Sequence, residues 1–235
     1  MQRKLAVITG SNKGIGKAIA IEFASHNFDV VITGRNETDL QAVSNQISQK
    51  YKVETFTFLV DLSQREGCLN FANFVKSLNR EITVLVNNAG KFEAGPMMTE
   101  GNDVLESQMA TNVYSAYYVT KYLWDNLKKA NRSHVFNICS IASINAYAAG
   151  GSYSVSKHAL LGFSKSLRLE GIPFQVNVTA VLPGATLTDS WSGVDLPETR
   201  FMRPEDVAKV VLNAWYINEY TVVEEVLLRP LLGDI

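Results

Sequence analysis

The sequence pairs a tyrosine with a lysine four residues later in two places, at Tyr153 and Lys157 and again at Tyr117 and Lys121. This spacing puts both side chains on one face of a helix. A lysine cation beside a phenol favours the phenolate and brings the pKa of the phenol down from about 10 toward neutral pH. Such a phenol can exchange a proton with a reacting oxygen, for example the alkoxide that forms when a carbonyl is reduced. Either pair can instead be two polar residues on an exposed helix.

The residues around the two pairs differ. Ser140 ends the apolar run 134–140 and precedes Tyr153 by thirteen residues. A serine hydroxyl there can donate a hydrogen bond to a substrate oxygen. Tyr117 has no such serine and lies within a long helical stretch with Tyr114, Tyr118 and Tyr122, an aromatic surface better explained by packing between helices or subunits. We therefore predict that Tyr153 and Lys157 form the site.

A second candidate site is the glycine-rich segment T-G-S-N-K-G-I-G at Thr9–Gly16, between an apolar run and a helical stretch. Its glycines let the backbone turn tightly and approach a pyrophosphate, and a helix N-terminus attracts phosphate. The spacing G-x-x-x-G-x-G differs from the commoner G-x-G-x-x-G. By itself the segment can also be an ordinary turn.

The elements that must position these residues alternate along the whole chain. Short apolar runs, which predict strands buried on both faces, lie at 5–9, 29–34, 54–61, 82–87, 134–140, 174–183 and 222–228. Amphipathic segments, which predict helices, lie at 15–26, 38–50, 64–79, 103–130, 152–170 and 204–216, and the second opens with a possible capping box at Thr38–Gln41. The pattern predicts an α/β fold: one domain over 1–235, a Rossmann-type doubly wound parallel sheet of about seven strands with helices on both faces, and ligands at the carboxyl ends of the strands.

Composition excludes several classes of function. The 235 residues are 46% hydrophobic and 19% charged, with a net charge of −1, so nothing indicates a nucleic-acid partner. The two cysteines, Cys68 and Cys139, and three scattered histidines show no disulfide framework and no metal-ligand spacing. We find neither a signal peptide nor an apolar run long enough to span a membrane, and we expect a cytoplasmic protein.

Several motifs in a fixed order indicate a known family. They are the glycine segment, Asp61-Leu62 after the third run, N-N-A-G at Asn87–Gly90, Asn112, Ser140, Tyr153 with Lys157, P-G-A-T-L-T at Pro183–Thr188, and R-P-E-D-V-A at Arg203–Ala208. In this respect the chain resembles the short-chain dehydrogenase/reductase family over nearly its whole length.

The resemblance implies NADPH-dependent reduction of a ketone or aldehyde to an alcohol. Tyr153 would be the general acid/base, and Lys157 would lower its pKa and hold the nicotinamide ribose. Ser140 would orient the substrate oxygen, and Asn112 would help to hold the lysine and a water chain. Two alternatives remain: a regulatory protein that binds NADP(H) without turnover, and a dehydratase or epimerase on the same fold.

The choice of cofactor rests on the end of the second run. NAD-binding folds place a carboxylate there for the ribose 2′-hydroxyl, whereas this chain has Gly34-Arg35. Glu37 lies later and is expected to be solvated. Arg35 and Lys13 can both reach a 2′-phosphate, or both can be surface cations. We predict NADP(H).

Further roles follow from the resemblance. Asp61 would bind the adenine amino group and the N-N-A-G turn would pack against the adenosine, although Asn87 can equally be a structural turn residue. The implied cofactor-binding residues are Gly10, Ser11, Asn12, Lys13, Gly14, Ile15, Gly16, Arg35, Asp61, Leu62, Asn87, Ala89, Gly90, Tyr153, Lys157, Pro183, Gly184, Thr186 and Thr188.

The substrate side is less defined by sequence. Segment 184–203, which covers the substrate in the family, carries Trp191, Leu196 and Phe201, and these can line an apolar lid or pack on the sheet. Tyr147 and Phe92 are further lining candidates, with core packing as the alternative. The chain lacks the glycine-rich ending common in ketoacyl carrier-protein reductases, which argues against that activity. The family commonly forms homodimers or homotetramers through the helices expected at 103–130 and 152–170.

Overall fold

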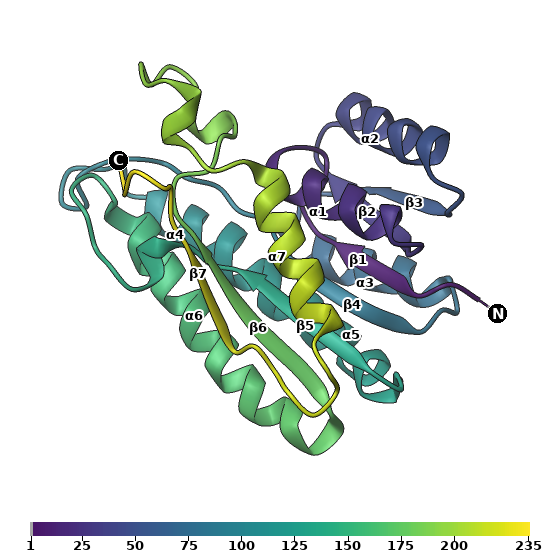
Figure 1. Ribbon diagram of the computed structural model, residues 1–235. Helices are drawn as coiled ribbons and strands as arrows, with labels where there is room; N and C mark the ends of the chain where they lie inside the picture. The colour runs from purple at the N-terminus through teal and green to yellow at the C-terminus, as the bar shows by residue number, and fades with distance from the viewer. Residues whose placement is uncertain (1) are drawn as a thin grey trace.

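The computed structural model describes residues 2–235 and contains one seven-stranded sheet in the order β3-β2-β1-β4-β5-β6-β7 (Figure 1). Every strand pair is parallel. The strands are β1 (Leu5–Ile8), β2 (Asp29–Gly34), β3 (Thr55–Leu59), β4 (Ile82–Asn87), β5 (Ser133–Ile138), β6 (Val176–Pro183) and β7 (Glu225–Leu228). The predicted Rossmann-type parallel sheet is confirmed.

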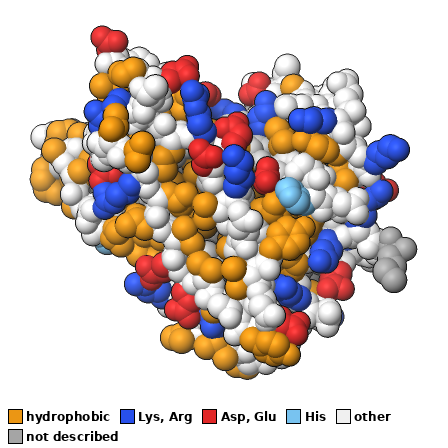
Figure 2. Space-filling model, in the orientation of Figure 1, with side chains coloured by type: hydrophobic (Ala, Val, Ile, Leu, Met, Phe, Trp, Pro, Cys, Tyr) orange, Lys and Arg blue, Asp and Glu red, His pale blue; other side chains and the backbone are white. Residues whose placement is uncertain are grey.

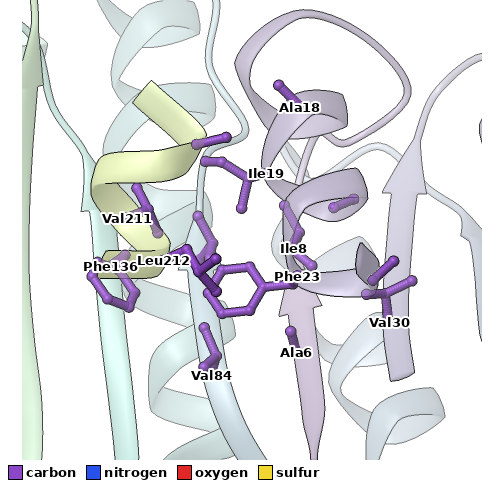
Figure 3. Packing of buried hydrophobic residues seen from close by; sticks show 14 of the residues in the cluster. Ala6, Ile8, Ala18, Ile19, Phe23, Val30, Val84, Phe136, Val211 and Leu212 are labelled. Atoms are coloured by element: carbon purple, nitrogen blue, oxygen red, sulfur yellow. The ribbon is translucent and has the colours of Figure 1, made fainter. Parts of the chain in front are cut away.

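Helices cover both faces of this sheet. They are α1 (Gly14–Ser25), α2 (Glu37–Lys50), α3 (Arg65–Ser77), α4 (Val104–Met109), α5 (Ser115–Lys129), α6 (Gly151–Gly171) and α7 (Pro204–Tyr216). Buried side chains of α1, α2 and α7 form one core cluster with the sheet, and those of α3 and α5 form another on the opposite face, which Leu167 of α6 joins. In the first cluster Phe23 and Ile19 of α1 pack beside Val211 and Leu212 of α7 on the same face of the sheet (Figure 3).

The apolar runs are continuous because alternate residues of each strand point to opposite faces. In β1, Ala6 and Ile8 belong to the cluster under α1 and α7, whereas Leu5 and Val7 belong to the cluster under α3 and α5. All four side chains are fully buried. A central strand with both faces covered therefore needs no polar alternation.

The strand order reverses between β1 and β4. From β1 the chain moves outward through β2 and β3, and then returns to β4 and continues in the other direction to β7. At such a switch point the connections leaving neighbouring strands diverge and leave a crevice at the carboxyl ends. The loops after β1, β4, β5 and β6 meet at this edge.

Two local expectations need correction. Helix α2 begins at Glu37 and its N-cap is Asn36, whose side chain accepts a hydrogen bond from the Asp39 backbone N–H at 3.0 Å, so the capping box predicted at Thr38 is wrong. The helix expected at 103–130 contains a π-helical turn, Ala110–Tyr114, between α4 and α5. Within residues 2–235, no helix combines the length and apolar character that crossing a membrane demands.

Candidate active site

A cavity of about 1380 Å³ lies at the carboxyl edge of the sheet. Its walls come from the loops after β1, β2, β4, β5 and β6. Pockets of about 300–1,000 Å³ hold drug-sized ligands, so this one has room for a dinucleotide together with a small substrate. Figure 2 shows the upper surface hollowed between the protruding segment 184–203 on the left and α2 on the right.

The glycine loop forms one wall of the cavity. Gly10 and Gly14 have φ angles of +61° and +54°, which favour glycine. A Cβ atom on Gly10 would lie 2.8 Å from the Ala89 Cα, so a side chain would collide with the turn after β4. Asn12, Lys13 and Ile15 also line the wall. The loop thus brings bare backbone and the start of α1 to the cavity, which suits a phosphate.

Gly16 and Ser11 act differently from the other loop residues, since neither lines the cavity. A Cβ on Gly16 would lie 2.3 Å from Asn88 Nδ2, so glycine allows α1 to pack on the loop. The buried Ser11 hydroxyl donates to the Ile8 carbonyl at 2.8 Å and accepts from the Thr33 N–H at 2.9 Å. It ties the loop to β2 as a structural residue.

The N-N-A-G turn divides its two asparagines between two roles. Asn87 is buried and its amide donates to Thr120 Oγ1 at 2.9 Å and to Asn137 Oδ1 at 2.8 Å, so of the two interpretations the structure favours the structural one. Asn88, which sequence reasoning missed, lines the cavity and donates to the carbonyls of Thr9 and Gly10 at 3.0 and 2.8 Å. The repeated asparagine was the available signal, but its two copies look alike in sequence.

The other predicted cofactor residues gather at the cavity. These are Arg35, Asp61, Leu62, Ala89, Gly90, Pro183, Gly184, Thr186 and Thr188. Arg35 is exposed on the wall and, among residues 2–235, pairs with no carboxylate. Lys13 instead forms an ion pair with Asp189 of segment 184–203, Nζ to Oδ2 at 2.7 Å. Only Arg35 of the two expected cations is therefore uncommitted.

Tyr153, Lys157 and Ser140 converge at the same edge. Ser140 directly follows the Ile138-Cys139 end of β5, and α6 begins two residues before Tyr153. The Ser140 side chain lies close enough to the Tyr153 phenol to act on its pKa, and both residues line the cavity. Lys157 is buried one helical turn on, donates to the Ile138 carbonyl at 2.8 Å, and holds its Nζ 5.6 Å from the centre of the Tyr153 ring. The sequence-predicted residues therefore form one constellation.

Burial dominates the titration of this constellation. It raises the pKa of Tyr153 to about 12, with the Ser140 hydrogen bond acting in the opposite direction. Burial also lowers the pKa of Lys157 to about 8. For the protein by itself, the expectation that Lys157 brings the pKa of the phenol below its ordinary value is wrong. Burial removes the phenolate from water, and the free energy that this costs exceeds the stabilisation that the neighbouring groups give to the phenolate.

Asn112 lies in the π-helical turn and is buried. Its amide donates to Ser156 Oγ at 2.9 Å and to the Lys91 carbonyl at 3.0 Å, and its oxygen accepts from the Lys91 N–H at 2.8 Å. A Cβ on the intervening Gly90 would lie 3.3 Å from Asn112 Oδ1 and 3.8 Å from Lys157 Nζ. Asn112 thus holds the turn after β4 against α6 close to the lysine, and π-turns of this kind occur frequently at functional sites.

The second pair, Tyr117 and Lys121, does form a contact, Nζ to phenol oxygen at 3.1 Å, on the exposed side of α5. The Tyr117 ring packs edge-on against Tyr118 and Phe163. Neither Tyr117 nor Lys121 lines the cavity.

The aromatic candidates on the substrate side divide similarly. Phe92, Tyr147 and Trp191 line the cavity, and the Phe92 ring meets the Tyr153 ring edge-on at 4.9 Å. Phe201 is buried, with its ring centre 5.2 Å from that of Trp191, and Leu196 is exposed. Neither residue lines the cavity. Segment 184–203 therefore covers the cavity with Trp191 and packs against the rest of the protein with Phe201.

A Rossmann-type sheet with a glycine loop at its switch point and a serine, tyrosine and lysine at the same edge defines a class of Rossmann-fold oxidoreductases. The sequence pattern of the family described as short chain dehydrogenase matches residues 4–198. The chain belongs to the short-chain dehydrogenase/reductase family.

Similar proteins cover almost the whole chain. Sepiapterin reductase of Chlorobaculum tepidum is 32% identical over 241 residues, which span 99% of this chain and 98% of that protein. A metagenomic short-chain oxidoreductase solved with NADP is 32% identical with a TM-score of 0.85, covering 97% of this chain and 96% of that one. L-Sorbose reductase from Gluconobacter frateurii, solved with NADPH and L-sorbose, is 26% identical with a TM-score of 0.90, covering 98% and 96%.

Proposed function

We propose that the protein reduces a ketone or aldehyde to an alcohol with NADPH as the hydride donor. The observation that carries this proposal is that Tyr153 and Ser140 line the cavity close to each other, with Lys157 one turn away, at the edge that also holds the glycine loop. Two hydroxyl donors that meet beside a nucleotide-sized cavity suit a carbonyl oxygen that gains negative charge.

The protein's own residues would handle the oxygen and the proton. The Ser140 and Tyr153 hydroxyls donate hydrogen bonds to the carbonyl oxygen, and Tyr153 transfers its proton as the alkoxide develops. The reduced nicotinamide supplies the hydride. A pKa of about 12 keeps the phenol protonated at neutral pH, which is the form that reduction needs. The reverse reaction needs the phenolate, which the charge of Lys157 would stabilise.

NADP(H) fits the residues of the cavity. Side chains at Gly10 and Gly14 would meet the turn after β4 and Thr188, so both positions keep bare backbone at the cavity wall, which suits the pyrophosphate. The guanidinium of Arg35 at the end of β2 suits the 2′-phosphate, because a planar fork matches phosphate geometry. Both solved relatives described above were crystallised with NADP or NADPH. Lys157 would hold the nicotinamide ribose and Asp61 the adenine.

The wider context is also proposed. The substrate is a small carbonyl compound, and the protein acts in the cytoplasm without a nucleic-acid or membrane partner. It forms a homodimer or homotetramer through α5 and α6. The exposed Tyr117 of α5 and Tyr114 of the π-helical turn before it support that assembly, since aromatic side chains are enriched at interfaces.

The test is consumption of NADPH with a panel of ketones, aldehydes and ketoacyl thioesters, run with the unmodified protein and with Tyr153→Phe. We expect stoichiometric oxidation of NADPH that the variant loses. Substrate conversion without net NADPH loss would instead indicate a dehydratase or epimerase. Tight NADPH binding with no conversion of any substrate would indicate a regulatory protein.

A further inference from the structure

The sheet order separates the two ends of the cavity. The glycine loop and the N-N-A-G turn follow β1 and β4, whereas Ser140, Gly184 and Arg229 follow β5, β6 and β7. Pairing of β6 with β7 and a hydrogen bond from the Gly184 N–H to the Leu228 carbonyl at 2.8 Å keep the last two ends together. Residues after β7 therefore lie beyond the strand end that carries Ser140, on the side away from the glycine loop.

Three polar side chains meet at that far end. The Arg229 guanidinium pairs with the Asp234 carboxylate. The Asn145 amide has one orientation in which both of its polar atoms find partners. In that orientation its oxygen accepts from Arg229 Nη2 at 3.3 Å and its nitrogen donates to the Ile144 carbonyl at 3.0 Å. Asn145 and Asp234 line the cavity, whereas Arg229 stands behind them. We call Asn145, Arg229 and Asp234 the distal cluster.

One oxygen of the distal cluster has no partner of its own. Asp234 Oδ2 takes the Arg229 contact, while Oδ1 receives no hydrogen bond from any residue within 2–235. Oδ1 lies beside Gly184, a residue of the cavity wall, and a Cβ on that glycine would lie 3.5 Å from it. The backbone carbonyl of Asp234 accepts from Arg200 of segment 184–203 at 3.3 Å, which fixes this residue against the lid.

We propose that the distal cluster recognises the end of the substrate opposite its carbonyl, and that this end carries O–H or N–H donors and no negative charge. The inference rests on the proposed carbonyl reduction. Asp234 Oδ1 is a carboxylate oxygen at the cavity that no donor of the described residues occupies, so it suits an O–H or N–H donor of the substrate and disfavours a second carboxylate. The walls of the same cavity include Phe92, Tyr147 and Trp191, which suit a ring or another flat apolar part of the substrate.

The experiment uses three acetophenones that differ only at the para position: methyl, hydroxymethyl and carboxylate. With NADPH, we expect kcat/KM for the hydroxymethyl ketone to exceed that for the carboxylate about tenfold or more, the usual effect of one hydrogen bond to a charged group. Asp234→Asn should remove most of this preference by improving the carboxylate, and should leave the methyl ketone within about twofold. Asp206→Asn is the matched control, since Asp206 is also ion-paired, to Lys209, but on α7.

The outcomes separate the two proposals. If all three ketones react equally well, or if Asp234→Asn leaves their ranking unchanged, the distal cluster has no such role while carbonyl reduction stands. If none reacts, the proposed function fails for this class, and binding of the same compounds, followed by tryptophan fluorescence, still tests recognition, because Trp191 lines the cavity. If Asp234→Asn then leaves the relative affinities for the three compounds unchanged, the proposed recognition by the distal cluster is overturned. Asn145→Ala keeps the Arg229–Asp234 pair and should weaken the binding of the hydroxymethyl compound only.

Discussion

Lys13 of the glycine loop lies 2.7 Å from the carboxylate of Asp189, so an ion pair joins the proposed cofactor wall to segment 184–203 across 176 residues of sequence. Both side chains are largely exposed, 61% and 70%, so the pair is weak and sensitive to salt. The same ammonium group cannot serve Asp189 and a 2′-phosphate equally well. We therefore expect Asp189 and the proposed cofactor to compete for Lys13.

Asp189→Asn should release Lys13 for the cofactor. We expect the dissociation constant for NADPH to fall about two- to threefold at low salt, because a surface pair contributes little. NADH, which has no 2′-phosphate, should bind as before. Titration of cofactor fluorescence at low and high salt measures both constants. Asp195→Asn is the control, an exposed carboxylate on the same segment without a basic partner within residues 2–235, and an equal gain in this variant would refute the competition.

Arg35→Ala should weaken NADPH binding about tenfold or more and leave NADH within about twofold, because one charge-assisted contact to phosphate is lost. The measurement is the dissociation constant of each cofactor. Lys209→Ala, which removes an exposed cation from α7, controls for net charge. Equal loss for both cofactors would place Arg35 outside the 2′-phosphate site.

A switch toward NADH by a carboxylate at Gly34 is not a clean test. A Cβ on Gly34 would lie 2.7 Å from the side-chain carbon and oxygen of Asn12, so Gly34→Asp would displace the glycine loop. The sequence shows that a glycine ends β2, but it does not show that the Asn12 side chain packs against this glycine. Arg35 is therefore the better position for the substitution.

The fold could be predicted from the sequence because its signal is local. Each apolar run reports that a strand is covered on both faces, and the ends of neighbouring parallel strands must meet at one edge. Ser140 and Tyr153 could be placed together on that ground, one at a strand end and one at a helix start. Their convergence in the structure needs no long-range information beyond the strand order.

The remaining side chains could not be placed because their partners lie far along the chain. Ser11 bonds Thr33, and Asn87 bonds Thr120 and Asn137, through contacts that only the assembled layers create. Both residues match cofactor motifs in sequence and hold the scaffold in space. The raised pKa of Tyr153 has a similar origin, since it depends on how much protein surrounds the phenol.

His134 should make the protein sensitive to acid. It is fully buried on β5, stacks on Phe136 and contacts Thr179, and burial lowers its pKa from 6.5 to about 3, with Arg132 and Arg168 acting in the same direction. Between these two values the unfolded chain binds a proton that the folded chain does not. The free energy of unfolding therefore falls as the pH drops below about 6.5 and stops falling near 3.

Two pH units below 6.5, this histidine should cost roughly 2–3 kcal/mol of stability, since each unit is worth about 1.4 kcal/mol. Urea unfolding near neutral pH and at a pH of about 4.5 measures the loss. His134→Gln removes the titrating group, so the loss between the two pH values should shrink by most of that amount, whatever the variant's stability at neutral pH. Contributions of the carboxylates are common to both proteins. An unchanged loss would show that His134 does not govern the acid response.

Tyr153→Phe and Tyr117→Phe together decide which tyrosine–lysine pair is chemical. Tyr153→Phe removes only the hydroxyl and keeps the ring that packs edge-on against Phe92. Turnover should fall about 10²–10⁴-fold, the usual contribution of a positioned proton donor, while NADPH still binds. Lys157→Met should damage both turnover and cofactor binding, because it removes the buried cation proposed to hold the ribose.

Tyr117→Phe is the matched control, since its hydroxyl also contacts a lysine four residues on but lies on the exposed side of α5. Its turnover should stay within a few-fold, and any effect should appear in stability or assembly. Each variant is compared at saturating NADPH with one carbonyl substrate, after circular dichroism has shown that it folds. Loss of activity in a folded Tyr117→Phe protein, with activity kept in Tyr153→Phe, would assign the chemistry to the surface pair. The position of Tyr153 beside Ser140 on the cavity wall, and the absence of Tyr117 from that wall as described for residues 2–235, argue for the opposite result.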